Sequence, residues 1–131
     1  MARSDDILRL SADIVRLFNP QRVILFGSHA YGMPTADSDV DLLIVMPHEM
    51  PASKTATRIR LGVNPTSPMD LLVRTAAELT KSAADKDWFI VEVLEKGIIL
   101  HDHANRAMGT KGRSRLRRRL AAALIAQTQP V

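Results

Sequence analysis

The sequence predicts a small mixed α+β fold in which helices flank a sheet of few strands. Short apolar runs that suit buried strands alternate with longer stretches in which apolar residues recur at helical spacing. The strand candidates are residues 23–26, 40–46 and 69–73, with a short fourth at 98–100. A chain of 131 residues is long enough for one domain with a single core.

The first expected element is a helix that runs from Ser4 to Phe18. Ser4 can cap its start, and Asp5 with Asp6 suits the positive end of the helix dipole. Asn19 and Pro20 then end it. Its apolar stripe is expected in the core and comprises Ile7, Leu10, Ile14, Leu17 and Phe18.

The first strand candidate ends in Gly27-Ser28, a turn that suits a phosphate group. Glycine lets a phosphate approach the backbone closely, Ser28 offers a hydroxyl, and the N–H groups of a helix that starts here would point at an anion. Residues 29–32 are expected as a short helical turn. His29 could contact a nucleotide, but we expect it to be a solvated turn residue.

Asp39 and Asp41 open the second strand candidate. Side chains alternate faces along a strand, so both carboxylates point to one side while Val40 points to the other. A fold keeps two such charges together where a cation or a shared proton relieves their repulsion. Mg²⁺, which binds a couple of carboxylates together with substrate phosphates, meets this need.

The rest of the domain is expected to form three helices and one strand, and this strand adds a third carboxylate to the candidate site. A helix at 53–61 carries Lys54, Arg58 and Arg60, and the strand at 69–73 presents Asp70. Thr75 and Glu78 have the spacing of a capping box.

The last expected helix covers residues 85–96 and ends at Gly97. Its apolar residues are expected in the core: Trp88, Phe89, Ile90, Val93 and Leu94. For Trp88 we favour the core over a base-stacking platform.

At these residues the chain resembles the nucleotidyltransferase superfamily typified by DNA polymerase beta and kanamycin nucleotidyltransferase. It is most similar to the minimal nucleotidyltransferases (MNT) of bacteria and archaea, whose signature is Gly-Ser, ten residues and Asp-x-Asp. Here Gly27-Ser28 is followed by residues 29–38 and Asp39-Val40-Asp41, and Asp70 matches the third carboxylate of the family. Many relatives carry Arg where this chain has His29 and Tyr31, which puts triphosphate contacts beyond Gly27-Ser28 in doubt.

The resemblance implies a polymerase beta-like fold and a Mg²⁺-dependent transfer of AMP from ATP to a hydroxyl. Asp39 and Asp41 would hold one Mg²⁺, and Asp41 with Asp70 a second ion that lowers the pKa of the acceptor hydroxyl. Asp70 is also the expected base. Gly27 and Ser28 would bind the β- and γ-phosphates, and Arg60 is the candidate for neutralising phosphate charge.

MNT proteins are typically encoded beside a HEPN ribonuclease toxin, and some silence it by transferring AMP to a tyrosine. The resemblance therefore implies an antitoxin whose partner is a HEPN-domain protein. Two alternatives stay open: a binding antitoxin without catalysis, and a stand-alone nucleotidyltransferase acting on a small molecule of the antibiotic type.

The charge divides the chain into a domain at 1–103 and a basic tail at 104–131. Residues 1–105 carry 11 Lys and Arg against 14 Asp and Glu, whereas residues 106–131 carry seven and none. The tail could be mobile, dock as a helix on an acidic partner, or contact nucleic acid phosphates; we expect one of the first two. The absence of cysteine and of any membrane-spanning apolar run favours a cytoplasmic protein.

Overall fold

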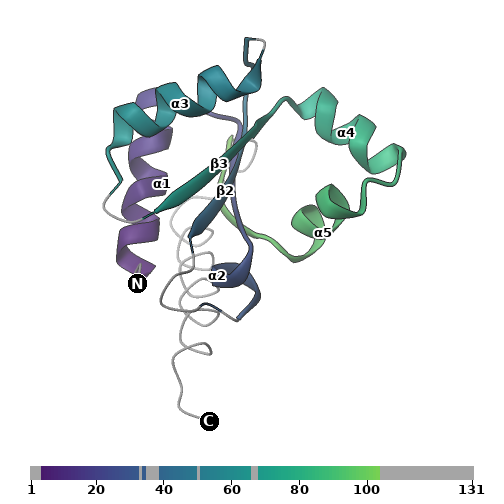
Figure 1. Ribbon diagram of the computed structural model, residues 1–131, viewed down its shortest axis with the longest axis horizontal. Helices are drawn as coiled ribbons and strands as arrows, with labels where there is room; N and C mark the ends of the chain where they lie inside the picture. The colour runs from purple at the N-terminus through teal and green to yellow at the C-terminus, as the bar shows by residue number, and fades with distance from the viewer. Residues whose placement is uncertain (1–3, 33, 35–38, 50, 66–67, 104–131) are drawn as a thin grey trace.

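The computed structural model describes residues 4–32, 34, 39–49, 51–65 and 68–103. Four strands form its sheet: β1 (Arg22–Phe26), β2 (Val40–Val45), β3 (Met69–Arg74) and β4 (Ile98–Asp102). The helices around it are α1 (Ser4–Phe18), α2 (Ser28–Tyr31), α3 (Ala52–Val63), α4 (Ala76–Ala84) and α5 (Trp88–Lys96) (Figure 1).

The strands form one mixed sheet in the order β3-β2-β1-β4. β1 is antiparallel to both β2 and β4, whereas β2 and β3 are parallel. Parallel neighbours need a crossover connection, which α3 supplies. The small mixed sheet flanked by helices that the sequence predicted is therefore confirmed.

Helices cover both faces of the sheet, with α1 and α3 on one side and α4 and α5 on the other (Figure 1). The strands consequently bury side chains in both directions, which is why β2 is almost continuously apolar. The side chains of β2 that face α1 and α3 are Val40, Leu42 and Ile44. The side chains of β2 that face α4 and α5 are Leu43 and Val45.

α1 begins and ends at the residues that the sequence indicated. Ile7 and Ile14 of its apolar stripe are buried, but Leu17 is 46% exposed, so its assignment to the core was wrong. Asn19 ends the helix in a left-handed conformation with φ 48°. Its N–H still reaches the carbonyl of Val15 at 2.9 Å.

α4 begins with the capping box predicted from Thr75 and Glu78. The Thr75 hydroxyl accepts the N–H of Glu78 at 3.0 Å, and the Glu78 carboxylate accepts the N–H of Thr75 at 2.9 Å. The same carboxylate oxygen bonds Nε2 of His48, whose side chain is 4% exposed. This contact ties the loop after β2 to the start of α4.

α5 begins at Trp88 rather than at residue 85. Lys86 has a φ of 58°, which interrupts a continuous helix. Asp87 is the N-cap, and its carboxylate accepts the N–H of Ile90 at 3.4 Å.

The prediction that all apolar residues of α5 lie in the core was wrong for three of them. Ile90 and Val93, three residues apart, face the sheet and are buried. Trp88, Phe89 and Leu94 are 71%, 50% and 36% exposed. A short helix packed on one face buries one stripe, and these three side chains project to either side of it.

The basic tail at 104–131 lies outside the described residues, so the three interpretations of it given above stay predictions. Within the described part of the chain, no helix is long and apolar enough to cross a membrane.

We expect the pair formed by His48 and Glu78 to stabilise the fold within a window of pH. The hydrogen bond from Glu78 raises the pKa of His48 above 6.5, while the Thr75 N–H, and then His48, lower the pKa of Glu78 below 4.5. The His48 contribution is present below pH 6.5 and lost as the pH rises through its folded pKa. The Glu78 contribution is present above pH 4.5 and lost as the pH falls through its folded pKa.

The free energy of unfolding of His48→Ala should therefore fall furthest below that of the wild type between pH 4.5 and 6.5. Urea denaturation across this range and above it measures the difference. Thr80→Ala, an uncharged change on the exposed side of α4, is the control. A deficit in His48→Ala that does not change with pH would contradict the prediction.

Candidate active site

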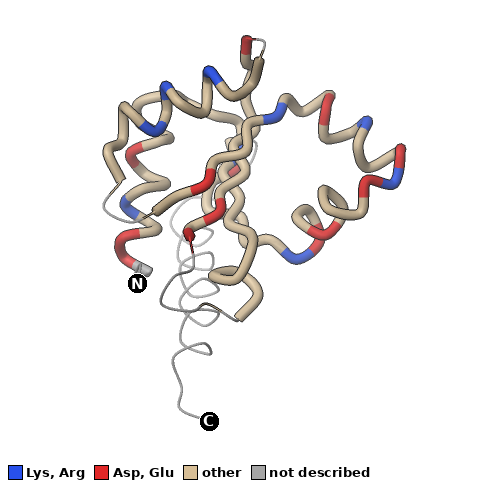
Figure 2. The backbone as a smooth tube through the Cα atoms, in the orientation of Figure 1, with Lys and Arg blue, Asp and Glu red and all other residues tan. Residues whose placement is uncertain are grey.

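Two carboxylates, of Asp41 and Asp70, lie at one end of the sheet on the face that α4 and α5 cover, with the charge of Asp39 nearby. Val40 and Leu42 pack toward α1 and α3, so Asp41 between them points the other way. The parallel register sets Asp41 opposite Asp70, which has the same orientation on β3. In Figure 2 the acidic segments of these two strands lie side by side. Asp39 precedes β2 and is half-buried.

The turn after β1 lies directly against this cluster. β1 runs antiparallel to β2, so its last residue, Phe26, pairs with Asp41. Gly27 follows with φ 74° and ψ −161°, a conformation that is essentially restricted to glycine. A Cβ added at Gly27 would overlap the carboxylate of Asp41. The structure therefore brings together the turn and the acidic pair that the sequence singled out.

Within the cluster, Asp41 is the carboxyl whose pKa is clearly shifted. Burial raises the pKa of Asp41 to about 6, with further contributions from the charges of Asp70 and Asp39 and from a hydrogen bond with Asp70. A carboxyl–carboxylate hydrogen bond requires a proton between the two groups. The cluster is thus an anionic site whose repulsion is partly relieved when Asp41 binds a proton, below about pH 6.

The donor set of this cluster suits a hard divalent cation, because carboxylate oxygens are the ligands that Mg²⁺ takes from proteins. Among the described residues, no group of three or more His, Cys, Asp or Glu side chains is already arranged to hold a metal ion. Asp41 and Asp70, which are in contact, supply two carboxylates. That number fits Mg²⁺, which completes its coordination with water and substrate phosphates.

α2 starts at Ser28, one residue before the helical turn expected at 29–32, and places Tyr31 one helical turn after Gly27. The Gly27 N–H donates to the Tyr31 hydroxyl oxygen. Burial raises the pKa of this phenol, and the charges of Glu92 and Asp41 raise it further. Tyr31 therefore lies between the carboxylate cluster and α5. The sequence analysis gave it no role, although a spacing of four from Gly27 already placed it near the turn.

His29 is 1% exposed, so the prediction of a solvated side chain was wrong. α2 packs on β1, and a single helical turn against a sheet buries one of its sides.

Arg60 lies on α3, which covers the sheet face opposite the one to which Asp41 and Asp70 point. Its Nη2 donates to the carbonyl of Met69 at 3.0 Å, which holds the guanidinium at the start of β3 beside Asp70. This contact is with the backbone of the residue before Asp70, and the role of Arg60 in binding phosphate stays a prediction.

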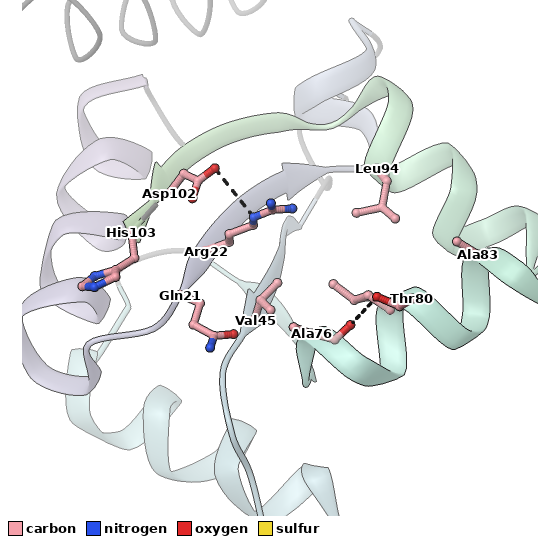
Figure 3. Close-up of a pocket in the computed structure, with 10 residues that line it drawn as sticks. Gln21, Arg22, Val45, Ala76, Thr80, Ala83, Leu94, Asp102 and His103 are labelled. Carbon is pink, nitrogen blue, oxygen red and sulfur yellow. Dashed lines mark hydrogen bonds and ion pairs between the residues drawn. The ribbon is translucent and has the colours of Figure 1, made fainter. Parts of the chain in front are cut away.

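A groove of about 620 Å³ lies on the same face of the sheet at the other end (Figure 3). Leu79 of α4 and Leu94 of α5 line it, and an ion pair between Arg22 and Asp102, at 3.7 Å, lies at the sheet side. Arg22 is the first residue of β1 and Phe26 the last, so the length of that strand separates the groove from the carboxylates.

Gly27→Ala tests the close approach of the turn to Asp41. At φ 74° and ψ −161° a residue other than glycine is strained by about 1–3 kcal/mol, and here the new Cβ also collides with the carboxylate. The matched control is Gly32→Ala: Gly32 has φ 94° and no atom within 4 Å of the added Cβ. We expect Gly27→Ala to lower the free energy of unfolding by more than Gly32→Ala does, as measured by urea denaturation. Equal losses would contradict the collision.

Asp41→Asn should stabilise the metal-free protein above pH 6. Because the folded pKa of Asp41 is raised from 3.8 to about 6, the folded state binds its proton more tightly than the unfolded state, and stability falls as the pH rises through this range. Melting temperatures in a chelating buffer should show a gain that fades below pH 3.8. Asp13→Asn, on the opposite helical layer, should show no such gain above pH 6. A lower melting temperature for Asp41→Asn at neutral pH would refute this interpretation.

A comparison with protein families agrees with this geometry. The model of the nucleotidyltransferase domain family matches residues 7–115, a segment that contains Gly27, Ser28 and all three carboxylates. Among curated proteins, none matches the chain. The four-stranded mixed sheet with helices on both faces is consistent with the polymerase beta-like fold of this superfamily. Since the match covers most of its length, the chain belongs to the nucleotidyltransferase domain family.

Proposed function

We propose that this nucleotidyltransferase transfers AMP from ATP to a hydroxyl of a partner protein, and that the hydroxyl belongs to a tyrosine. The observation that carries the proposal is the contact between Asp41 and Asp70, set directly against the Gly27 turn. A triphosphate and an acceptor hydroxyl are the two groups that such a site has to bring together.

The described residues have separate tasks in this reaction. Gly27 and Ser28 bind the β- and γ-phosphates, because the turn lets an anion approach its backbone. Arg60, held at the start of β3, offsets phosphate charge. Mg²⁺ held by Asp39, Asp41 and Asp70 would supply the positive charge that lets a triphosphate approach three carboxylates and would lower the pKa of the acceptor hydroxyl.

The chemistry is an in-line displacement at the α-phosphorus. The acceptor oxygen forms the new bond to phosphorus while the bond from the α-phosphorus to the bridging oxygen breaks, and pyrophosphate leaves. Asp70 takes the proton of the acceptor hydroxyl. Asp70 is exposed, on the edge strand β3, where a protein-borne hydroxyl can reach it.

The acceptor is proposed to arrive on a second protein, a HEPN-domain toxin, in the cytoplasm. The described residues form one α+β unit, and no second lobe among them could enclose a small acceptor. Resemblance to the minimal nucleotidyltransferases supports this partner, and the exposed position of Asp70 suits it.

The test is transfer of label from α-³²P-ATP in the presence of Mg²⁺, with and without the protein encoded beside this chain. We expect label on the partner, reduced at least about a hundredfold in the Asp39→Ala/Asp41→Ala double variant, because the charge on the transferred group loses its compensation. Asp13→Ala, which removes a carboxylate of α1 on the other sheet face, should label as the wild type does.

Modification that survives in the double variant would refute the assigned carboxylates. An unlabelled partner that still forms a stable complex would favour the non-catalytic antitoxin. Turnover with an aminoglycoside, without any partner, would favour the stand-alone enzyme.

A further inference from the structure

Three of the five aromatic side chains in the chain are exposed rather than buried. Trp88 and Phe89 open α5 with exposures of 71% and 50%, and Tyr31 at the end of α2 is 37% exposed. Large aromatic side chains are ordinarily placed where they remove apolar area from water. A group of them left in solvent marks a surface that contacts something else.

Phe89 and Tyr31 lie at the end of the sheet that holds the carboxylates. The ring of Phe89 packs edge-on against that of Phe26, with centroids 5.7 Å apart and an angle of 83° between the planes. Phe26 pairs with Asp41 and directly precedes Gly27. One aromatic ring therefore separates Phe89 from the residues proposed to bind the triphosphate.

Tyr31 and α5 border the same end of the site. The Tyr31 hydroxyl lies at the Gly27 N–H and within electrostatic reach of both Asp41 and Glu92. Glu92 lies three residues after Phe89 on α5, within the next turn of the helix. The N-terminal half of α5 is thus a wall of the site that carries exposed aromatic surface.

We propose that Phe89, with Trp88 beside it, is the stacking platform for the base of the nucleoside triphosphate. The inference rests on the proposed function, which puts a triphosphate at Gly27 and Asp41, so that its base must lie within one nucleotide length of them. Phe89 meets that condition and leaves half of its surface in solvent. A nucleobase is flat and aromatic, and it gains from stacking on such a side chain.

Stacking has a consequence for specificity. Every base presents a π-face, so a platform of this kind tolerates different bases and favours those with more area. The platform should therefore bind purine nucleotides more tightly than pyrimidine nucleotides.

The test compares a ligand that has a base with one that lacks it. Calorimetric titration of the full chain with ATP and with inorganic tripolyphosphate, both with Mg²⁺, gives the two affinities. Phe89→Leu keeps apolar volume against Phe26 but removes the aromatic ring. We expect it to weaken ATP binding by about tenfold and to leave tripolyphosphate binding unchanged.

Two further variants complete the design. Phe89→Tyr retains an aromatic face and should bind ATP as the wild type does. Leu61→Ala removes an apolar side chain that is 78% exposed on α3, across the sheet, and should change neither affinity.

The outcomes separate this inference from the proposed function. Wild-type protein that binds neither ligand would overturn both. Wild-type protein that binds ATP, with equal affinity in Phe89→Leu, would overturn the platform alone. Equal weakening of ATP and tripolyphosphate would show that Phe89 acts through its packing on Phe26, and would also overturn it. Unchanged ATP binding with lost modification of the partner would assign the aromatic surface to the acceptor protein instead.

Discussion

Repulsion between Asp41 and Asp70 is the constraint on which the rest of the site depends. The parallel register of β2 and β3 sets the two carboxylates opposite each other, and Asp39 adds a third charge nearby. Burial, and then the charges of Asp70 and Asp39, raise the pKa of Asp41 to about 6, and a proton bound there relieves part of the repulsion. A ligand that replaces this proton has to bring positive charge of its own. A metal-complexed triphosphate does so, whereas a bare phosphate does not.

Strand direction explains why two stretches of sequence, separated by ten residues, meet at this point. β1 is antiparallel to β2, so the end of β1, where the chain turns at Gly27, lies beside the start of β2, where Asp41 stands. β3 is parallel to β2, so its start brings Asp70 to the same place. Gly27, with its positive φ, then lets the turn close on Asp41 without a side chain between them. Antiparallel and parallel pairing are both required, and the mixed sheet is therefore a condition for the site.

The sequence was sufficient for the features that depend on local pattern. Apolar runs located the strands, Thr75 and Glu78 located the start of α4, and the period of two placed Asp41 on the face opposite Val40 and Leu42. The sequence was insufficient where the burial of a side chain depends on how its helix packs against the rest of the fold. The stripe of α5 that faces the sheet depends on how the helix docks, so Trp88 was wrongly placed in the core. The burial of His29 depends in the same way on the packing of α2 on β1.

Two unfavourable features lie at one end of the sheet: repulsion among carboxylates and aromatic surface exposed to water. A ligand that relieves either of them gains binding free energy. Within the part of the chain that the structure describes, the charges of Asp70 and Asp39 raise the pKa of Asp41 further and the aromatic rings at the start of α5 are exposed, while the apolar clusters on both faces of the sheet hold the fold together. Any ligand that binds only the folded state stabilises it by mass action. A nucleoside triphosphate with its metal carries the cation that the carboxylates lack and the flat apolar group that Phe89 and Trp88 can cover. One ligand would thus relieve both deficits, which accounts for their lying at the same end of one sheet.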